Sequence, residues 1–191
     1  MITAAEIARA IQGCWRLARF DPSGMDFFDK TIEGFWRSFW VAAIVAPAYM
    51  LLGWFDGGGT VIETGPVRQY TVEAIAYVIS WVAFPLAMFY LTRLMDREQD
   101  FVGYVVAYNW SHIVQVAVFL PVWATVPEDP TTPSGWSLIM TVATVIVLIY
   151  VGFIAKTALR ITAMMASGVV ALDVALSLFI GGIRDALLLS G

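Results

Sequence analysis

The feature that most constrains this chain is a series of five apolar stretches, each about twenty residues long. They cover residues 36–55, 72–91, 101–122, 136–154 and 163–183. A helix rises about 1.5 Å per residue, so each stretch is long enough to cross about 30 Å of hydrocarbon. The sequence therefore predicts an all-α polytopic membrane protein with five transmembrane helices.

Composition agrees with a bilayer as the solvent. Of the 191 residues, 60% are hydrophobic and 14% are charged, and the mean hydropathy is +0.77. A soluble domain carries about a quarter charged residues, so the surplus apolar side chains need lipid around them. The chain has no basic domain and no basic run interleaved with aromatic residues, which argues against a nucleic-acid partner.

Basic residues predict the orientation. Nine of the eleven Lys and Arg residues fall before the first stretch or in the connections after the second and fourth: Arg9, Arg16, Arg19, Lys30, Arg37, Arg93, Arg97, Lys156 and Arg160. The positive-inside rule then places the N-terminus in the cytoplasm and the C-terminus in the periplasm of a bacterial inner membrane. The first ten residues lack a basic start followed by an apolar core, so we expect no cleavable signal peptide.

Residues 1–35 form a lead that differs from the membrane domain at 36–191. Apolar residues recur at helical spacing on one face and three arginines share the other: Ile7, Ile11, Trp15 and Ala18 against Arg9, Arg16 and Arg19. This pattern predicts a cytoplasmic amphipathic helix whose arginines contact the membrane surface. The alternatives are a simple run-in to the first membrane helix and a dedicated element that binds lipid or a partner.

Small residues recur along several of the apolar stretches. Ser137, Thr141 and Thr144 begin such a row in the fourth stretch. Rows of small residues let membrane helices approach closely, so we interpret them as packing surfaces. A lined pore is the functional alternative.

The third stretch contains four polar residues within "AYNWSHIVQV", residues 107–116. At 100° per residue, Asn109, His112 and Gln115 share one arc of a helix, and Ser111 flanks it. Unpaired polar groups are costly in lipid, so this face should point into the bundle. His112, the only histidine, lies near the membrane midplane on a helical rise. We interpret it as a hydrogen-bonding core residue, with proton or solute handling as the alternative.

Asp173 is the other ionisable residue expected at that depth, and Ser177 shares its face. If the fifth helix begins at residue 163, Asp173 lies about 15 Å into the membrane and can meet His112. If the helix begins near Ser167 and Gly168 instead, Asp173 lies close to the inner interface. The sequence leaves both possibilities open.

Catalytic and cofactor patterns are missing from the sequence. One histidine cannot supply the paired histidines of common zinc motifs, and the single cysteine, Cys14, allows neither an internal disulfide nor a thiolate cluster. The chain has no Gly-x-Ser-x-Gly elbow. We therefore expect no enzymatic activity, no metal and no cofactor.

Two stretches, "GFWRSFWVAAIVAP" at 34–47 and "ALDVALSLFI" at 171–180, together with the arrangement of lead and spans, resemble the Yip1-type integral membrane proteins. The resemblance implies a non-enzymatic protein that interacts with other membrane proteins or shapes membranes. We therefore expect a scaffold or accessory subunit whose partners are lipid and other membrane proteins or itself. The alternative is a small transporter or channel that uses the polar site around His112 and Asp173.

Overall fold

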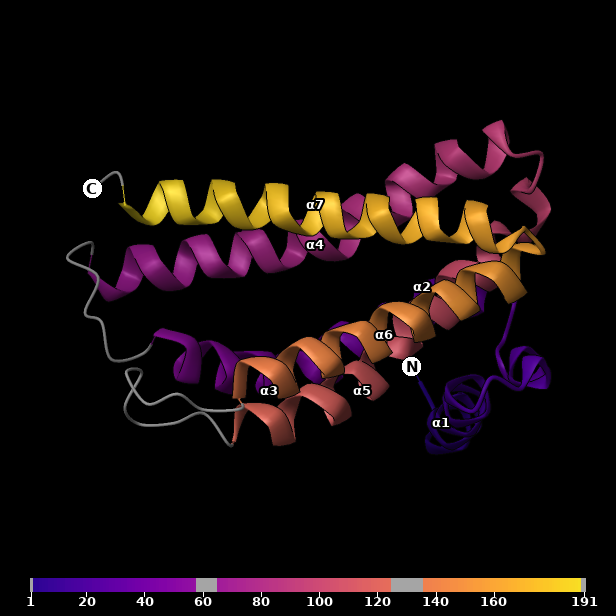
Figure 1. The fold of residues 1–191 in the computed structure, drawn as a ribbon, viewed down its shortest axis with the longest axis horizontal. Helices are drawn as coiled ribbons and strands as arrows, with labels where there is room; N and C mark the ends of the chain where they lie inside the picture. The colour runs from indigo at the N-terminus through magenta and orange to yellow at the C-terminus, as the bar shows by residue number, and fades with distance from the viewer. Residues whose placement is uncertain (1, 58–64, 125–135, 190–191) are drawn as a thin grey trace.

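The computed structural model describes residues 2–57, 65–124 and 136–189, and every regular element in them is helical (Figure 1). The prediction of an all-α protein is therefore confirmed. In chain order the elements are α1 (Ala4–Ala18), the 3-10 helix η1 (Pro22–Phe27), α2 (Ile32–Ser38), α3 (Trp40–Gly57), α4 (Pro66–Leu94), the 3-10 helix η2 (Glu98–Asp100), α5 (Phe101–Trp123), α6 (Trp136–Leu159) and α7 (Ala163–Leu189).

Four helical segments are long and apolar enough to cross a membrane. They are Val67–Leu94, Glu98–Trp123, Ser137–Leu159 and Ala163–Leu189. These agree with the last four predicted stretches, although each helix extends beyond its predicted end. The first predicted stretch, 36–55, is not one helix, because α2 ends at Ser38 and α3 begins at Trp40.

The start of the last helix, which the sequence leaves open, is at Ala163. The Thr162 hydroxyl accepts a hydrogen bond from the Met165 backbone N–H at 3.2 Å. This is the usual N-cap bond, which pairs a backbone N–H that has no partner within the helix. The alternative start near Gly168 is wrong, because that glycine lies inside the first turns of α7.

Helix α5 lies at the centre of the molecule and packs against α1, α2, α3 and α6. Eight consecutive residues, Tyr104–Ser111, are buried, so this part of the helix has no exposed face. Helices α4 and α7 run side by side at one flank (Figure 1), and α7 also contacts α6. The pair leaves most of its surface uncovered by protein, as helices that face lipid do.

Three turns end their helices in the same way, with a non-glycine residue in the left-handed region. Phe20, Asp96 and Arg160 have φ values of 59°, 55° and 54°. In each case the next N–H bonds back to the carbonyl five residues earlier: Asp21 to Arg16, Arg97 to Thr92, and Ile161 to Lys156. These bonds satisfy carbonyls that the helix end would leave unpaired. The turns after α4 and α6 lie at one end of the bundle, where Arg160 pairs with Asp100 at 3.6 Å.

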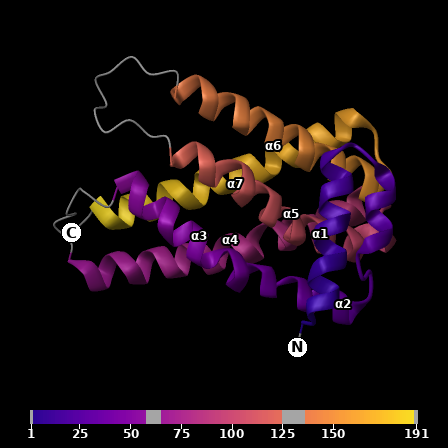
Figure 2. The ribbon, with the colours of Figure 1, turned by 90° about the horizontal axis from the view of Figure 1, so that it is seen from below.

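Helix α1 crosses the long helices at the same end (Figure 2). It buries a row of small and apolar residues, Ala10, Gly13, Cys14 and Leu17, against α5, α6 and η1. The contact with η1 is close: a Cβ on Gly13 would lie 2.9 Å from the Gly24 carbonyl oxygen, and a Cβ on Gly24 would lie 2.6 Å from the Gly13 carbonyl oxygen. Residues 4–27 therefore form a fitted cap on the bundle.

Two of the apolar residues that the sequence places on one face of α1 lie outside this buried row. Ile11 and Trp15 are 45% and 62% exposed.

The burial of Cys14 raises the pKa of its thiol to about 12, which keeps it protonated and unreactive.

The row of Ser137, Thr141 and Thr144 is exposed, so it does not pack against another described helix of this chain. The threonine hydroxyls instead donate to carbonyls of their own helix, Thr141 to Ser137 at 2.7 Å and Thr144 to Met140 at 2.8 Å. A side-chain hydroxyl satisfied in this way can face lipid. The buried face of α6 consists mainly of larger residues, such as Val147, Tyr150 and Ile154.

Candidate functional site

Three of the predicted polar residues of α5, Ser111, His112 and Gln115, form one hydrogen-bonded group around Tyr108. The Ser111 hydroxyl donates to the Tyr108 carbonyl at 2.6 Å, and Gln115 Nε2 donates to the Ser111 hydroxyl at 3.2 Å. His112 Nδ1 lies 3.2 Å from the same Tyr108 carbonyl. Asn109 and Ser111 are fully buried, whereas His112 and Gln115 are half-buried. Ser111, His112 and Gln115 are thus linked with Tyr108 along one helix, whereas the Asn109 side chain bonds elsewhere.

Asn109 joins this helix to α2. Its Nδ2 donates to the Ser38 hydroxyl at 2.8 Å, and that hydroxyl donates in turn to the Phe35 carbonyl at 2.7 Å. Asn109 Oδ1 is buried and has no hydrogen-bond partner among the described residues. The bond is an interhelical tie between two buried side chains, Asn109 and Ser38.

Asp173 contacts the group from α7. The Tyr108 hydroxyl donates to Asp173 Oδ1 at 2.9 Å. The Tyr108 ring also packs edge-on against the His112 imidazole, with ring centroids 5.1 Å apart, and the Trp81 ring of α4 lies 4.6 Å from the same imidazole at an angle of 36°. Tyr108 therefore connects the two residues that the sequence suggests as a pair, and the described residues show no hydrogen bond directly between His112 and Asp173.

The depth of this group follows from the helix positions. Asp173 lies ten residues after the start of α7 and His112 eleven residues after the start of α5, or roughly 15 and 16 Å along each helix. Ser177, one turn beyond Asp173, is exposed and lies outside the hydrogen-bonded group. An imidazole, a phenol and a carboxylate at mid-depth can hold a polar ligand or exchange protons, and they can equally hold helices together.

Tyr108 and Ser38 are the members that the sequence analysis missed. Tyr108 stands four residues before His112, so helical spacing places both on one face. A tyrosine in an apolar stretch is also a ready hydrogen-bond donor for a carboxylate. Ser38 gave no comparable signal, because 71 residues separate it from Asn109.

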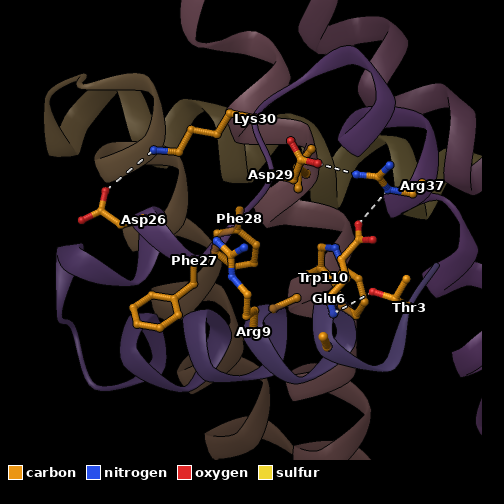
Figure 3. A pocket seen from close by; sticks show the side chains of 13 residues that line it. Thr3, Glu6, Arg9, Asp26, Phe27, Phe28, Asp29, Lys30, Arg37 and Trp110 are labelled. Atoms are coloured by element: carbon orange, nitrogen blue, oxygen red, sulfur yellow. Dashed lines mark hydrogen bonds and ion pairs between the residues drawn. The ribbon is translucent and has the colours of Figure 1, made fainter.

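A second candidate site is an open cleft of about 700 Å³ between α1 and the segment from η1 to α2 (Figure 3). Val106 and Trp110 of α5 form its floor, and Phe27 and Phe28 line it from η1 and the residue that follows. Charged side chains surround these apolar residues: Glu6, Arg9, Asp26, Asp29, Lys30 and Arg37.

Arg37 is the best-satisfied charge in this cleft. Its Nε donates to Glu6 Oε1 at 3.0 Å, and its Nη2 donates to Asp29 Oδ2. The Thr31 hydroxyl and N–H also donate to Asp29, at 2.7 and 3.0 Å. These bonds hold the pKa of Asp29 below its usual value, and the bond from the Thr31 hydroxyl contributes most to this lowering. The Glu6–Arg37 pair ties α1 to α2 across the mouth of the cleft.

The three arginines expected at the membrane surface have different surroundings. Arg16 is held within the cap: it donates to the Ser23 hydroxyl at 2.8 Å and lies 4.7 Å above the Phe27 ring. Arg9 lines the cleft, and Arg19 is exposed.

Comparisons with known proteins add no relative. No protein-family profile, no curated protein and no solved structure matches the chain. Within residues 2–57, 65–124 and 136–189, no three His, Cys, Asp or Glu side chains are grouped so that they could hold a metal ion. The two sites are therefore interpreted from their own geometry.

Proposed function

We propose that this protein is a five-span integral protein of a bacterial inner membrane that acts as a non-enzymatic scaffold or accessory subunit, as the resemblance to Yip1-type proteins suggests. Four helices that can cross a membrane support the first part. As the fifth span we assign α3, whose 18 residues extend roughly 27 Å. The cap and the basic turns lie at one end of the bundle, and we assign that end to the cytoplasm.

The observation that carries the scaffold proposal is the open face of α7. Only Ala166, Val169 and Leu188 are buried in this 27-residue helix. Ser177 is exposed near mid-depth, and a Cβ added to Gly181 would meet nothing within 4 Å. Polar and small residues in membrane helices normally face protein rather than lipid, because they allow close packing and hydrogen bonding. The face that Ser177 and Gly181 share therefore suits another membrane helix.

Site-specific photocrosslinking in intact membranes tests this proposal. A photoreactive residue at position 177 or 181 should crosslink to protein, either a different membrane protein or a second copy of the chain. The same residue in place of Val145, which is 48% exposed on α6, should crosslink only to lipid. If positions 177 and 181 also yield lipid adducts alone, α7 faces the bilayer and the scaffold proposal fails.

Transport of protons or a small polar solute is the second candidate, and the link from Asp173 through Tyr108 to His112 favours it. Purified protein in sealed vesicles with a pH-sensitive dye inside provides the test. A pH-driven flux that Asp173→Asn and Tyr108→Phe both abolish would favour transport over the scaffold.

A further inference from the structure

The cleft between α1 and α2 has the chemistry of a site for an amphipathic ligand. Its wall and floor contain large apolar side chains, of which Phe28 and Trp110 are 5% and 2% exposed and therefore fixed by the core. Its rim contains charged side chains of α1, η1, the connection after η1 and α2. A small inorganic ion would leave the aromatic part of this surface unused, whereas a molecule with a polar head and an apolar tail would contact both parts.

The charges that line the cleft are unequally satisfied. Arg37 has two carboxylate partners. Lys30 and Asp26 are 4.0 Å apart with side chains 47% and 81% exposed, a pair that holds neither group firmly. None of the ion pairs among the described residues involves Arg9. Figure 3 shows Arg9 extending from α1 and Lys30 on the opposite wall. The cleft thus offers one unpaired guanidinium and one loosely held ammonium group.

The position of the cleft matches the boundary between headgroups and acyl chains. Val106 and Trp110 lie five and nine residues into α5, or roughly 7 and 13 Å from its start. The floor of the cleft therefore lies at the level of the acyl chains, whereas Lys30 on its rim lies beside Gly103, near the start of α5. The exposed Ile11 and Trp15 on α1 also suit the interfacial layer.

We propose that this cleft binds the phosphate of a glycerophospholipid headgroup, with Arg9 as its principal ligand and Lys30 as a second donor. A guanidinium recognises a phosphate through paired charge-assisted hydrogen bonds. Asp26, the most exposed carboxylate of the rim, can accept a hydrogen bond from the ammonium group of an ethanolamine headgroup. The first glycerol carbons and acyl groups then lie beside the half-buried Phe27, above the buried Phe28 and Trp110.

The test measures binding of soluble short-chain lipids to the full chain in a neutral maltoside detergent, by titration calorimetry. The probes are dihexanoyl-phosphatidylethanolamine, dihexanoylglycerol, which lacks the phosphate, and inorganic phosphate. We expect saturable binding of the phospholipid and affinities at least about tenfold weaker for the other two. Arg9→Gln should weaken phospholipid binding at least about tenfold, because it removes a charge-assisted pair of bonds. Arg19→Gln is the matched control on the same helix and should change binding less than about twofold.

A second pair of variants tests the space rather than the charge. Ala5 lines the cleft and Ala8 is an exposed residue of the same helix outside it. Ala5→Phe should reduce phospholipid binding, and Ala8→Phe should not. Equal effects of Arg9→Gln and Arg19→Gln would overturn the proposal, because they would indicate attraction to the basic surface as a whole. Binding of inorganic phosphate as tight as that of the lipid would also overturn it, in favour of a free-phosphate site.

Discussion

Removing the Ser38 hydroxyl should destabilise the protein more than removing the whole polar end of its partner, Asn109. In Ser38→Ala the Asn109 amide keeps its place in the core, where Ser38 is its only hydrogen-bond partner among the described residues. Both ends of a fully buried amide are then unpaired. In Asn109→Leu the amide itself is gone, and the Ser38 hydroxyl still donates to the Phe35 carbonyl at 2.7 Å.

The two variants should differ in how much they lower the free energy of unfolding. Stranding a buried donor costs about 1–3 kcal/mol, and hydrogen bonds between membrane helices average somewhat less, so we expect Ser38→Ala to lower the free energy of unfolding by about 1–2 kcal/mol. Asn109→Leu replaces a polar group by an apolar one of similar shape and also removes the unpaired Oδ1. Its effect should lie within about 1 kcal/mol of zero.

Reversible unfolding in mixed micelles, followed by circular dichroism, measures both values. The double variant should behave like Asn109→Leu alone, because the loss of the Ser38 hydroxyl matters only while the amide is present. If Asn109→Leu is the more destabilising variant by more than about 1 kcal/mol, the tie contributes more than its geometry indicates. Equal additive losses would likewise refute the reasoning.

Four further variants test other parts of the structure. Gly13→Ala should lower the free energy of unfolding by about 1–3 kcal/mol, seen as a lower Tm, because its Cβ would lie 2.9 Å from a backbone carbonyl oxygen. Asp96→Gly should raise Tm, by about 1 kcal/mol of stability, because it relieves an exposed residue at φ 55°. The pKa of Asp29 is lowered by its bonds in the cap, so its contribution to stability is complete above about pH 4 and is lost as the pH falls through the lowered value. Asp29→Asn should therefore have a lower Tm than wild type at pH 7, and the difference should shrink as the pH falls below that lowered value. His112→Leu should change stability by less than about 1 kcal/mol by chemical unfolding, since the carbonyl that faces its Nδ1 already accepts a serine hydroxyl at 2.6 Å.

Hydropathy and helical length, which depend only on neighbouring residues, predicted the all-α class and five apolar spans, of which four are helices long and apolar enough to cross a membrane in the described residues. Details that depend on packing were less accessible. Helix α1 buries Ala10, Cys14 and Leu17 against the bundle, whereas Ile11 and Trp15, two of the apolar residues that helical spacing grouped on one face, are exposed. The deciding factor is the mutual approach of Gly13 and Gly24, which no periodicity within a helix encodes.

The polar sites illustrate the same limit. Helical spacing grouped Asn109, His112 and Gln115 on one arc, because all three belong to α5. The bond from Asn109 to Ser38 and that from Tyr108 to Asp173 connect residues 71 and 65 positions apart. The Glu6–Arg37 pair that bounds the cleft spans 31 positions. Each of these depends on how helices come together, and a single sequence carries no direct record of that.

The complete enclosure of Tyr104–Ser111 in α5 has a consequence for the order of assembly in the bilayer. A segment with no lipid-facing side, and with an amide and a hydroxyl inside it, gains little from contact with acyl chains. Two of the elements that enclose it, α1 and α2, precede it in the chain and are synthesised first. They can therefore be in place at the membrane surface to pack against α5 when it leaves the insertion machinery. Helix α6, which follows in the chain, can then cover the side of α5 that is still exposed. The N-terminal cap is then part of the route by which the central helix enters the membrane, as well as part of the finished fold.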